Sequence, residues 1–329
     1  MTTIQCSHDI LVIGAGITGL LAARTLQAHG QTVIVLDKGR GVGGRMATRR
    51  IGSAVFDYGA QFFTARDQEF NALVDVWRAG DVALEWCRGF AGPDGVAHTD
   101  GHPRYRGSTG MTAVPKYLAR GLEIVLGQRV TSAEALIDRW RVRTEQGETF
   151  FADSLLLTAP VPQSLAILDA GATALPAEIR YALDAVSYHP CIALMIQPET
   201  SRLPSPGAIQ FSEGPIAWIG DNVQKGVSPH AAITLHADAK FSRDNWNSDD
   251  AKIISEIHSA ASAWVKEPVS DVQIRRWRYA KPEILHPEAC LSLEAPLPLV
   301  FAGDAFGTPR VEGAALSGLA AARALLGRV

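Results

Sequence analysis

The stretch ILVIGAGITGLLAARTLQAHGQTVIVLDKG, residues 10–39, holds a strand, a glycine turn, a helix and a second strand in one run. Apolar residues precede the GxGxxG sequence at 14–19, helical periodicity follows it, and a second apolar run ends at Asp37. In this context the turn lets the backbone and a helix N-terminus approach a pyrophosphate. Asp37 lies 18 residues after Gly19, where a carboxylate can accept hydrogen bonds from a ribose. The stretch predicts a dinucleotide-binding βαβ unit, because a chance glycine turn does not explain Asp37.

A second glycine-rich loop, KGRGVGGRM, follows at 38–46. A nicotinamide dinucleotide does not require it, whereas an extended FAD has a further stretch of pyrophosphate and ribityl chain to hold. The guanidinium of Arg45 can bind phosphate oxygens through two parallel hydrogen bonds. The loop therefore favours FAD, with a basic surface loop as the alternative.

Two more segments suit a flavin. In DYGAQFF, 57–63, small residues let the backbone lie against a flat ring and Gln61 can hydrogen-bond beside it, although a buried strand turn would have the same sequence. Asp304 ends an apolar run and can accept from ribityl hydroxyls, and the helix predicted over 311–326 can stabilise negative charge on reduced flavin. Tight packing of that helix on the sheet is the plainer reading. The predicted cofactor residues are Gly14, Ala15, Gly16, Ile17, Thr18, Gly19, Asp37, Lys38, Gly44, Arg45, Met46, Gly59, Ala60, Gln61, Val130, Ala159, Pro160, Gly303, Asp304, Glu312, Gly313 and Ala314.

Composition narrows the function classes. The 329 residues suggest two domains, and 47% hydrophobic content excludes a disordered chain. A net charge of −3 argues against nucleic acid or an anionic membrane surface as a partner. Four scattered cysteines and the spacing of His98 and His102 in an expected loop indicate no metal site. The apolar run 10–23 is too short to span a bilayer, and without a basic segment before it we expect a cytoplasmic protein.

The two ends of the chain differ from its middle. Apolar runs typical of parallel strands lie near both ends, whereas 192–196, 216–219, 231–237 and 272–279 resemble antiparallel strands, interrupted by a helix over 249–265. We therefore expect a two-domain α/β fold. The predicted FAD domain is discontinuous and comprises 1–70, 107–163 and 276–329; the substrate domain comprises 71–106 and 164–275.

Taken together, the motifs resemble those of the amine-oxidase-like flavoproteins with a p-hydroxybenzoate-hydroxylase topology, and within them the renalase family. The similarity extends over nearly the whole chain, with specific cofactor motifs and less specific substrate-side ones. Besides the segments above, it rests on the sequences TAP at 158–160, LDAVSY at 183–188, GDNVQK at 220–225 and RWRY at 276–279.

This resemblance implies non-covalent FAD and oxidation of the 2- and 6-dihydro isomers of NAD(P)H to NAD(P)+, with hydride transfer to flavin N5. O2, or alternatively a quinone, would reoxidise the flavin, O2 yielding hydrogen peroxide. Loss of hydride from a dihydropyridine gives an aromatic cation directly and needs no base, so no acid or base is assigned. The predicted substrate-face residues are Gln61, Phe62, Asn222, Lys225, His236, Trp277 and Tyr279.

Each of those residues also has an ordinary interpretation. His236 can be a hydrogen-bonded sheet residue, Asn222 and Lys225 turn residues, and Trp277 a packing anchor. An amine or other small-molecule oxidase is the alternative function, and a non-catalytic flavin redox sensor is a more distant one. Amine oxidation is disfavoured because we find no convincing lysine for a flavin-N5 water and no cysteine where covalent relatives attach their flavin.

Overall fold

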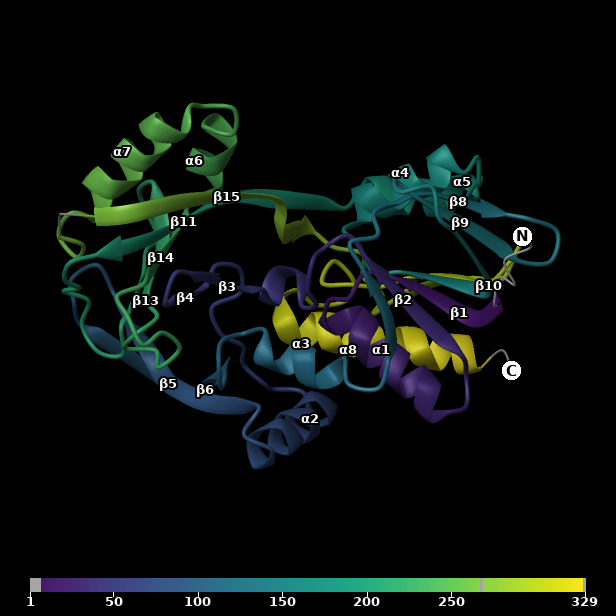
Figure 1. Ribbon diagram of the computed structural model, residues 1–329, viewed down its shortest axis with the longest axis horizontal. Coiled ribbons are helices and arrows are strands. Elements are labelled where there is room, and N and C mark those ends of the chain that lie inside the picture. The colour runs from purple at the N-terminus through teal and green to yellow at the C-terminus, as the bar shows by residue number, and fades with distance from the viewer. Residues whose placement is uncertain (1–6, 267–268, 328–329) are drawn as a thin grey trace. The chain divides into compact units, whose positions relative to one another are not determined.

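The computed structural model describes residues 7–266 and 269–327, and they divide into two compact units. Unit 1 contains the chain up to Gly44, Val114–Ser187 and the chain from Pro282 onward. Unit 2 contains Arg45–Ala113 and Tyr188–Lys281. Figure 1 shows the elements of each unit along the colour gradient.

Unit 1 is built on a sheet whose strands run in the order β16-β17-β10-β1-β2-β7, extended beside β10 by β9 and β8. The pairs β1–β2, β2–β7, β1–β10 and β10–β17 are parallel. Residues 10–13 and 33–36 are buried, as the unbroken apolar runs of a sheet covered on both faces require. The strands are β1 (Ser7–Ile13), β2 (Val33–Asp37), β7 (Glu123–Leu126), β8 (Val130–Ala135), β9 (Trp140–Thr144), β10 (Thr149–Leu157), β16 (Leu291–Leu293) and β17 (Leu299–Phe301).

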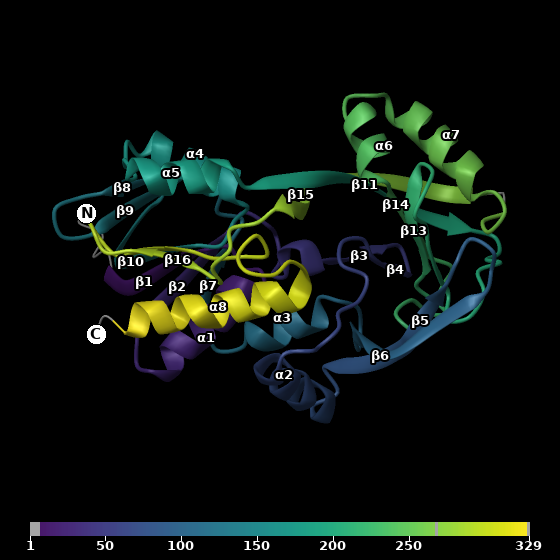
Figure 2. The same cartoon turned by 180° about the vertical axis from the view of Figure 1, so that it is seen from behind.

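Helices α1 (Ile17–Ala28) and α8 (Arg310–Leu326) lie side by side in both views (Figures 1 and 2). A side chain at Gly318 would overlap the carbonyl of Thr18, so the glycine permits this close approach. The Thr18 hydroxyl donates to the carbonyl of Ala314 at 2.7 Å. Tight packing of the small-residue helix is therefore part of the fold. The remaining helices of unit 1 are α4 (Val161–Ala170) and α5 (Ala177–Asp184), and α3 (Ala113–Leu118) starts at the unit boundary.

Unit 2 is built on a second sheet, in the order β15-β11-β14-β13-β12-β5-β6. The pairs β11–β14, β14–β13, β13–β12 and β5–β6 are antiparallel, and β12 and β5 make a short parallel contact. Apolar side chains of the sheet form a core with Ile253, Ile257 and Ala261 of α7. The elements are η1 (Gly44–Met46), β3 (Thr48–Ile51), β4 (Ala54–Asp57), α2 (Gln68–Ala79), β5 (Ala83–Ala91), β6 (Ala97–Gly107), β11 (Ser187–Pro198), β12 (Ala208–Gln210), β13 (Ile216–Asp221), β14 (Ile233–Ala237), α6 (Ala239–Asp244), α7 (Asp250–Ala261) and β15 (Val269–Ile284).

One sequence-based prediction needs correction, and the compact units divide the chain differently from the predicted domains. The loop expected around His98 and His102 is strand β6, paired with β5, and its hairpin turn lies earlier, near Gly95 with φ of 76°. The unit boundaries also differ from the predicted domains: 45–70 and 107–113 lie in unit 2, 164–187 in unit 1, and 276–281 in unit 2. Tertiary contacts explain these boundaries. Asp57 at the end of β4 is paired with Lys225 of unit 2, and α4 packs on β8 of unit 1.

None of the helices in the described part of the chain combines the length and the hydropathy that a bilayer crossing needs.

Candidate functional site

Four loops of unit 1 leave the sheet at the same edge. Ile13 is level with Leu36 and Leu157, and Leu157 is level with Phe301, in parallel strands. The segments after these strands therefore emerge together, at the edge where open α/β sheets bind their ligands. These segments contain the predicted cofactor residues Gly14–Gly19, Asp37–Lys38, Ala159–Pro160 and Gly303–Asp304.

The first glycine turn is shaped partly by the fold. Gly14 has φ of 116°, which disfavours any other residue, and its N–H donates to the carbonyl of Leu36 at 2.8 Å. A side chain at Gly14 would meet the hydroxyl of Thr158, and one at Gly19 would overlap the carbonyl of Gly14. These two glycines are thus explained by close packing of helix, strand and turn.

Gly16 is different, and it tests whether a dinucleotide fits. Its φ of −78° is open to any residue, and nothing lies within 4 Å of the position where its side chain would begin. Gly16 is the N-cap of α1, whose first N–H groups have no partner within the helix. The fold therefore leaves space for an anionic group beside a helix N-terminus, as a pyrophosphate requires.

Asp37 joins the two glycine loops. One carboxylate oxygen accepts from the N–H of Ala15 at 2.7 Å, and the other accepts from the N–H of Gly39 at 2.6 Å. The N–H of Gly43 in turn donates to the carbonyl of Ala15 at 2.8 Å. A carboxylate has about four acceptor positions, so Asp37 can hold both loops and still accept from a ribose. Near it, Val130 starts β8 just after Gln128, whose N–H donates to the carbonyl of Asp37.

The C-terminal loop is also held from within unit 1. The N–H of Gly303 donates to the hydroxyl of Ser317 in α8 at 2.8 Å, and Asp304 is buried. A side chain at Gly313 would collide with the carbonyl of Thr308, which gives this glycine a packing role. Glu312 lies in the first turn of α8.

In unit 2, Asp57 is the centre of a buried polar network. Its carboxylate is fully buried and lies 2.6 Å from the ammonium of Lys225, which is 1% exposed. The second carboxylate oxygen accepts from the Thr48 hydroxyl at 2.6 Å and from the N–H of Met111 at 2.7 Å. Burial lowers the pKa of Lys225 while the Asp57 charge opposes that shift. Lys225 is therefore a buried partner of β4 and not an exposed turn residue.

Asn222 and Gln61 hold the backbone next to Asp57. Asn222 is fully buried, accepts from the N–H of Asp57 at 3.2 Å and donates to the Thr234 hydroxyl at 3.1 Å. The side-chain amide of Gln61 donates to the carbonyls of Asp57 at 2.6 Å and Gly59 at 3.2 Å. The predicted substrate residues at 61, 222 and 225 thus meet in one network.

Tyr58 brings together two more predicted residues. Its carbonyl lies 3.2 Å from Nε2 of His236 and accepts from the indole N–H of Trp277 at 3.2 Å. The rings of Tyr58 and Trp277 are stacked at 5.3 Å. Burial lowers the pKa of His236 to about 4, so its imidazole is neutral at pH 7.

Arg45 and Tyr279 meet through the backbone. The Arg45 guanidinium donates to the carbonyl of Tyr279 at 3.1 Å, and the carbonyl of Arg45 accepts from the N–H of Ala60 at 2.8 Å. A side chain at Gly59 would overlap the Arg45 carbonyl, so the second loop and DYGAQFF are in direct contact. Met46 is buried beside them.

An aromatic cluster beside Gln61 was not predicted. Phe62 lies 4.9 Å from Phe90 and 5.7 Å from Trp218, and Trp86 lies 5.2 Å from Phe90, between ring centroids. The ammonium of Lys225 lies 5.2 Å from the Trp86 ring centroid, a cation–π distance. Only Phe62 of this cluster carried a sequence signal. The others come from β5 and β13, which lie on either side of β12, and the sequence did not reveal this arrangement.

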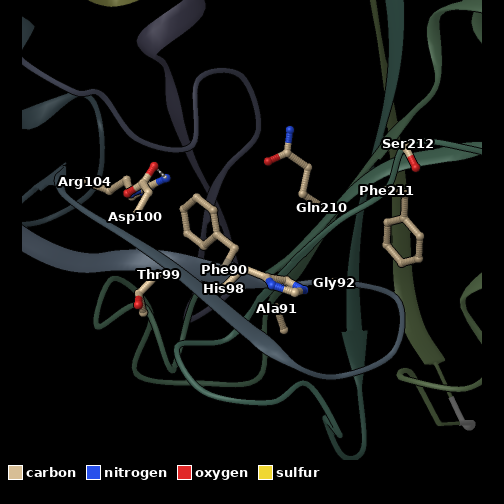
Figure 3. Close-up of a pocket in the computed structure, with 10 residues that line it drawn as sticks. All are labelled: Phe90, Ala91, Gly92, His98, Thr99, Asp100, Arg104, Gln210, Phe211 and Ser212. Carbon is tan, nitrogen blue, oxygen red and sulfur yellow. Dashed lines mark hydrogen bonds and ion pairs between the residues drawn. The ribbon is translucent and has the colours of Figure 1, made fainter.

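A hollow of about 440 Å³ is lined by residues of β5, β6 and β12 and of the segments that follow β5 and β12 (Figure 3). Arg104 forms a two-pronged ion pair with Asp100 at its rim, which lowers the pKa of that carboxyl, and lies 5.3 Å over the Phe90 ring. Phe90 therefore belongs to both the hollow and the aromatic cluster. The lining residues are Phe90, Ala91, Gly92, His98, Thr99, Asp100, Arg104, Gln210, Phe211 and Ser212.

Comparisons with known proteins identify two family models and several relatives that this chain matches. Residues 12–78 match the model of the NAD(P)-binding Rossmann-like domain, and residues 75–326 match that of the flavin containing amine oxidoreductases. Putrescine oxidase of Kocuria rosea is 37% identical over 100 residues, which cover 28% of this chain and 20% of that protein. Renalase of Mus musculus is 28% identical over 194 residues, 56% of each chain. The matched part thus spans little more than half of these relatives at most.

Solved structures agree on the fold. A structure of putrescine oxidase bound to putrescine has a TM-score of 0.74 and 15% identity, covering 98% of this chain and 100% of that one. A putative protoporphyrinogen oxidase from Exiguobacterium has a TM-score of 0.71 and 14% identity, over 98% and 100%. The two-unit α/β architecture with a Rossmann-like part is shared with both.

Proposed function

Since the chain belongs to the flavin containing amine oxidoreductase family and is an FAD-dependent oxidoreductase, we propose that it oxidises the 2- and 6-dihydro isomers of NAD(P)H to NAD(P)+. In this proposal it is a renalase-type enzyme with a p-hydroxybenzoate-hydroxylase-like topology, and O2 is reduced to hydrogen peroxide. The similarity to mouse renalase over 56% of the chain supports it.

Unit 1 would bind FAD and unit 2 the substrate. The space at Gly16 would take the pyrophosphate, Asp37 a ribose, and Asp304 the ribityl hydroxyls. The bound FAD supplies a hydride acceptor at N5 whose electrons pass to O2. Binding would be non-covalent, because we find no cysteine in the stretch where covalent relatives attach their flavin.

One observation carries the choice of substrate: the titratable groups beside Gln61 are paired with other groups of the protein. Asp57 is paired with Lys225 in a buried site, and the pKa of His236 is lowered to about 4. A general base works best when its pKa is near the working pH. A dihydropyridine becomes an aromatic cation on losing hydride, so its oxidation needs no such base.

The chain's own residues would then position the substrate. Tyr58 and Trp277 form a stacked aromatic pair, and Gln61 and Phe62 follow Tyr58 on the same loop. Asn222, Lys225 and His236 would act by holding this loop, since they bind Asp57, Thr234 and the Tyr58 carbonyl. Trp277 and Tyr279 are proposed as substrate-side residues of β15.

Amine oxidation on the same scaffold is the competing function, favoured by the likeness to putrescine oxidase. Turnover with borohydride-reduced NAD and NADP, compared with putrescine and a panel of monoamines, separates the two. We expect O2 uptake and NAD(P)+ formation in equal amounts with the reduced dinucleotides and no O2 uptake with amines. O2 uptake with an amine alone would replace the proposed substrate.

A further inference from the structure

Two buried polar atoms of unit 2 lack the hydrogen-bond partners that their chemistry demands. They are the carbonyl oxygen of the Gln61 side chain and the indole nitrogen of Trp218. The two residues are only 6% and 7% exposed. Buried polar groups in folded proteins are nearly always paired, so an unpaired group marks a place where a partner belongs.

The orientation of the Gln61 amide is set by its surroundings. Its NH2 group donates to the carbonyls of Asp57 at 2.6 Å and Gly59 at 3.2 Å. Turning the amide over would place an oxygen against these two carbonyl oxygens, which only accept. The Gln61 carbonyl oxygen therefore points away from the loop and can only accept, while the Trp218 indole N–H can only donate.

Both atoms face the same place. A side chain at Gly220 would begin 2.7 Å from the Trp218 nitrogen and 3.3 Å from the Gln61 oxygen. The donor and the acceptor therefore lie within about 6 Å of each other, and both pack over the same buried glycine. Tyr58, Gly59, Ala60 and Phe62 around Gln61 are all partly exposed, so the loop that carries the acceptor reaches the surface.

We infer that Gln61 and Trp218 form a subsite for a primary carboxamide, whose NH2 donates to Gln61 and whose carbonyl accepts from Trp218. This deepens the proposed function and rests on it, because the carboxamide would be that of the dihydronicotinamide. A carboxylate can accept a hydrogen bond from Trp218, but it is repelled by the Gln61 oxygen, which also only accepts. An ammonium can donate to the Gln61 oxygen, but it leaves the Trp218 N–H unpaired. The subsite therefore disfavours amine substrates.

The test is a binding titration of the oxidised holoenzyme, followed by the perturbation of its flavin absorption. The ligands are NAD+, its 3-acetylpyridine analogue, which lacks the NH2 donor, and its nicotinic acid analogue, which has a carboxylate. We expect the acetyl analogue to bind about tenfold more weakly than NAD+, because one buried acceptor is left unpaired, and the acid more weakly still. Equal affinities, or no binding of NAD+ at millimolar concentration, would overturn the subsite.

A variant tests the donor side. Trp218→Phe keeps an aromatic ring and removes the N–H, so it should weaken NAD+ about tenfold and leave the affinity for the unsubstituted pyridine dinucleotide unchanged. The matched control is Trp86→Phe, from the same cluster, whose indole N–H donates to the carbonyl of Pro206 at 3.1 Å. If Trp218→Phe weakens both ligands equally, or Trp86→Phe has the same effect, the assignment is wrong.

The hydrogen bond to Gln61 is tested by changing the ligand and not the protein. A substitution of Gln61 would also remove its hydrogen bonds to the carbonyls of Asp57 and Gly59. The analogue series in the unaltered protein decides the matter even when Trp218→Phe fails to fold. Flavin reduction by dihydro isomers is recorded separately. Reduction without discrimination among the analogues refutes the subsite alone, whereas discrimination without reduction refutes the proposed function alone.

Discussion

The glycine loops of unit 1 and the Asp57 network of unit 2 both serve a predicted binding region, and they are built in opposite ways. In unit 1, Asp37 contacts Ala15 and Gly39, which lie in the same βαβ stretch. In unit 2, Asp57 contacts Lys225, 168 residues further along the chain. The first region takes its form from local backbone geometry, and the second from a buried charge pair that only the tertiary fold assembles.

The largest expected effect is on the second region. Lys225→Met leaves the Asp57 carboxylate buried without its counter-charge, which should lower the free energy of unfolding by about 3–5 kcal/mol. Chemical denaturation of the purified variant measures this. Adding Asp57→Asn to Lys225→Met should recover part of the loss, since the unpaired charge is then gone.

The matched control is Lys240→Met. Its ammonium lies 2.6 Å from Asp244, the same distance as in the buried pair, but the side chain is 79% exposed. Exposed pairs contribute little, so we expect no measurable change in stability. A similar loss in both variants would mean that burial does not distinguish the Asp57 network.

A smaller effect concerns pH. Burial lowers the pKa of His236 to about 4 from an ordinary 6.5, so the unfolded chain binds a proton that the folded chain resists. The free energy of unfolding should fall as pH drops below about 6.5, by about 2–3 kcal/mol in total once pH reaches about 4. Denaturation between pH 4 and 8 measures the slope, and His236→Gln should reduce it while the exposed His29→Gln does not. An unchanged slope in His236→Gln would show that this imidazole is not the responsible group.

The smallest expected effect concerns unit 1. Gly16→Ala meets no atom within 4 Å, so the fold should tolerate it, while the methyl group enters the space assigned to the pyrophosphate. We expect FAD affinity to fall about tenfold, or 1.4 kcal/mol, with the stability of the FAD-free protein unchanged. Titration of the FAD-free protein gives the affinity. Gly80→Ala at the end of α2 is the control, and unaltered FAD affinity in Gly16→Ala would remove the pyrophosphate from this turn.

The same contrast explains what the sequence could predict. The βαβ unit, Asp37 and the C-terminal helix follow from patterns of fewer than 40 residues and were found. Strand β6 was taken for a loop because its glycines and aspartates are typical of turns, and pairing with β5 overrides that preference. The compact units divide at Arg45 and not after residue 70, because Arg45 and Asp57 bind Tyr279 and Lys225, far along the chain.

The candidate site shows the same limit. The sequence predicts Gln61, Asn222, Lys225, His236 and Trp277 as substrate-side residues, and the structure connects them through Asp57 and the carbonyl of Tyr58. No local pattern marks a backbone carbonyl as a meeting point. Trp218 was missed for a similar reason, since its relation to Gln61 depends on how β13 packs beside the loop after β4.

The central claim is that this FAD-dependent enzyme takes hydride from the 2- and 6-dihydro isomers of NAD(P)H. Its most direct test is anaerobic titration of the holoenzyme with purified 6-dihydro-NAD, followed by the visible band of oxidised flavin and by the NAD+ released. We predict loss of the band with one NAD+ formed for each flavin reduced. A band that stays intact with the 2- and 6-dihydro isomers of NAD and NADP, and disappears with putrescine or another amine, would contradict it.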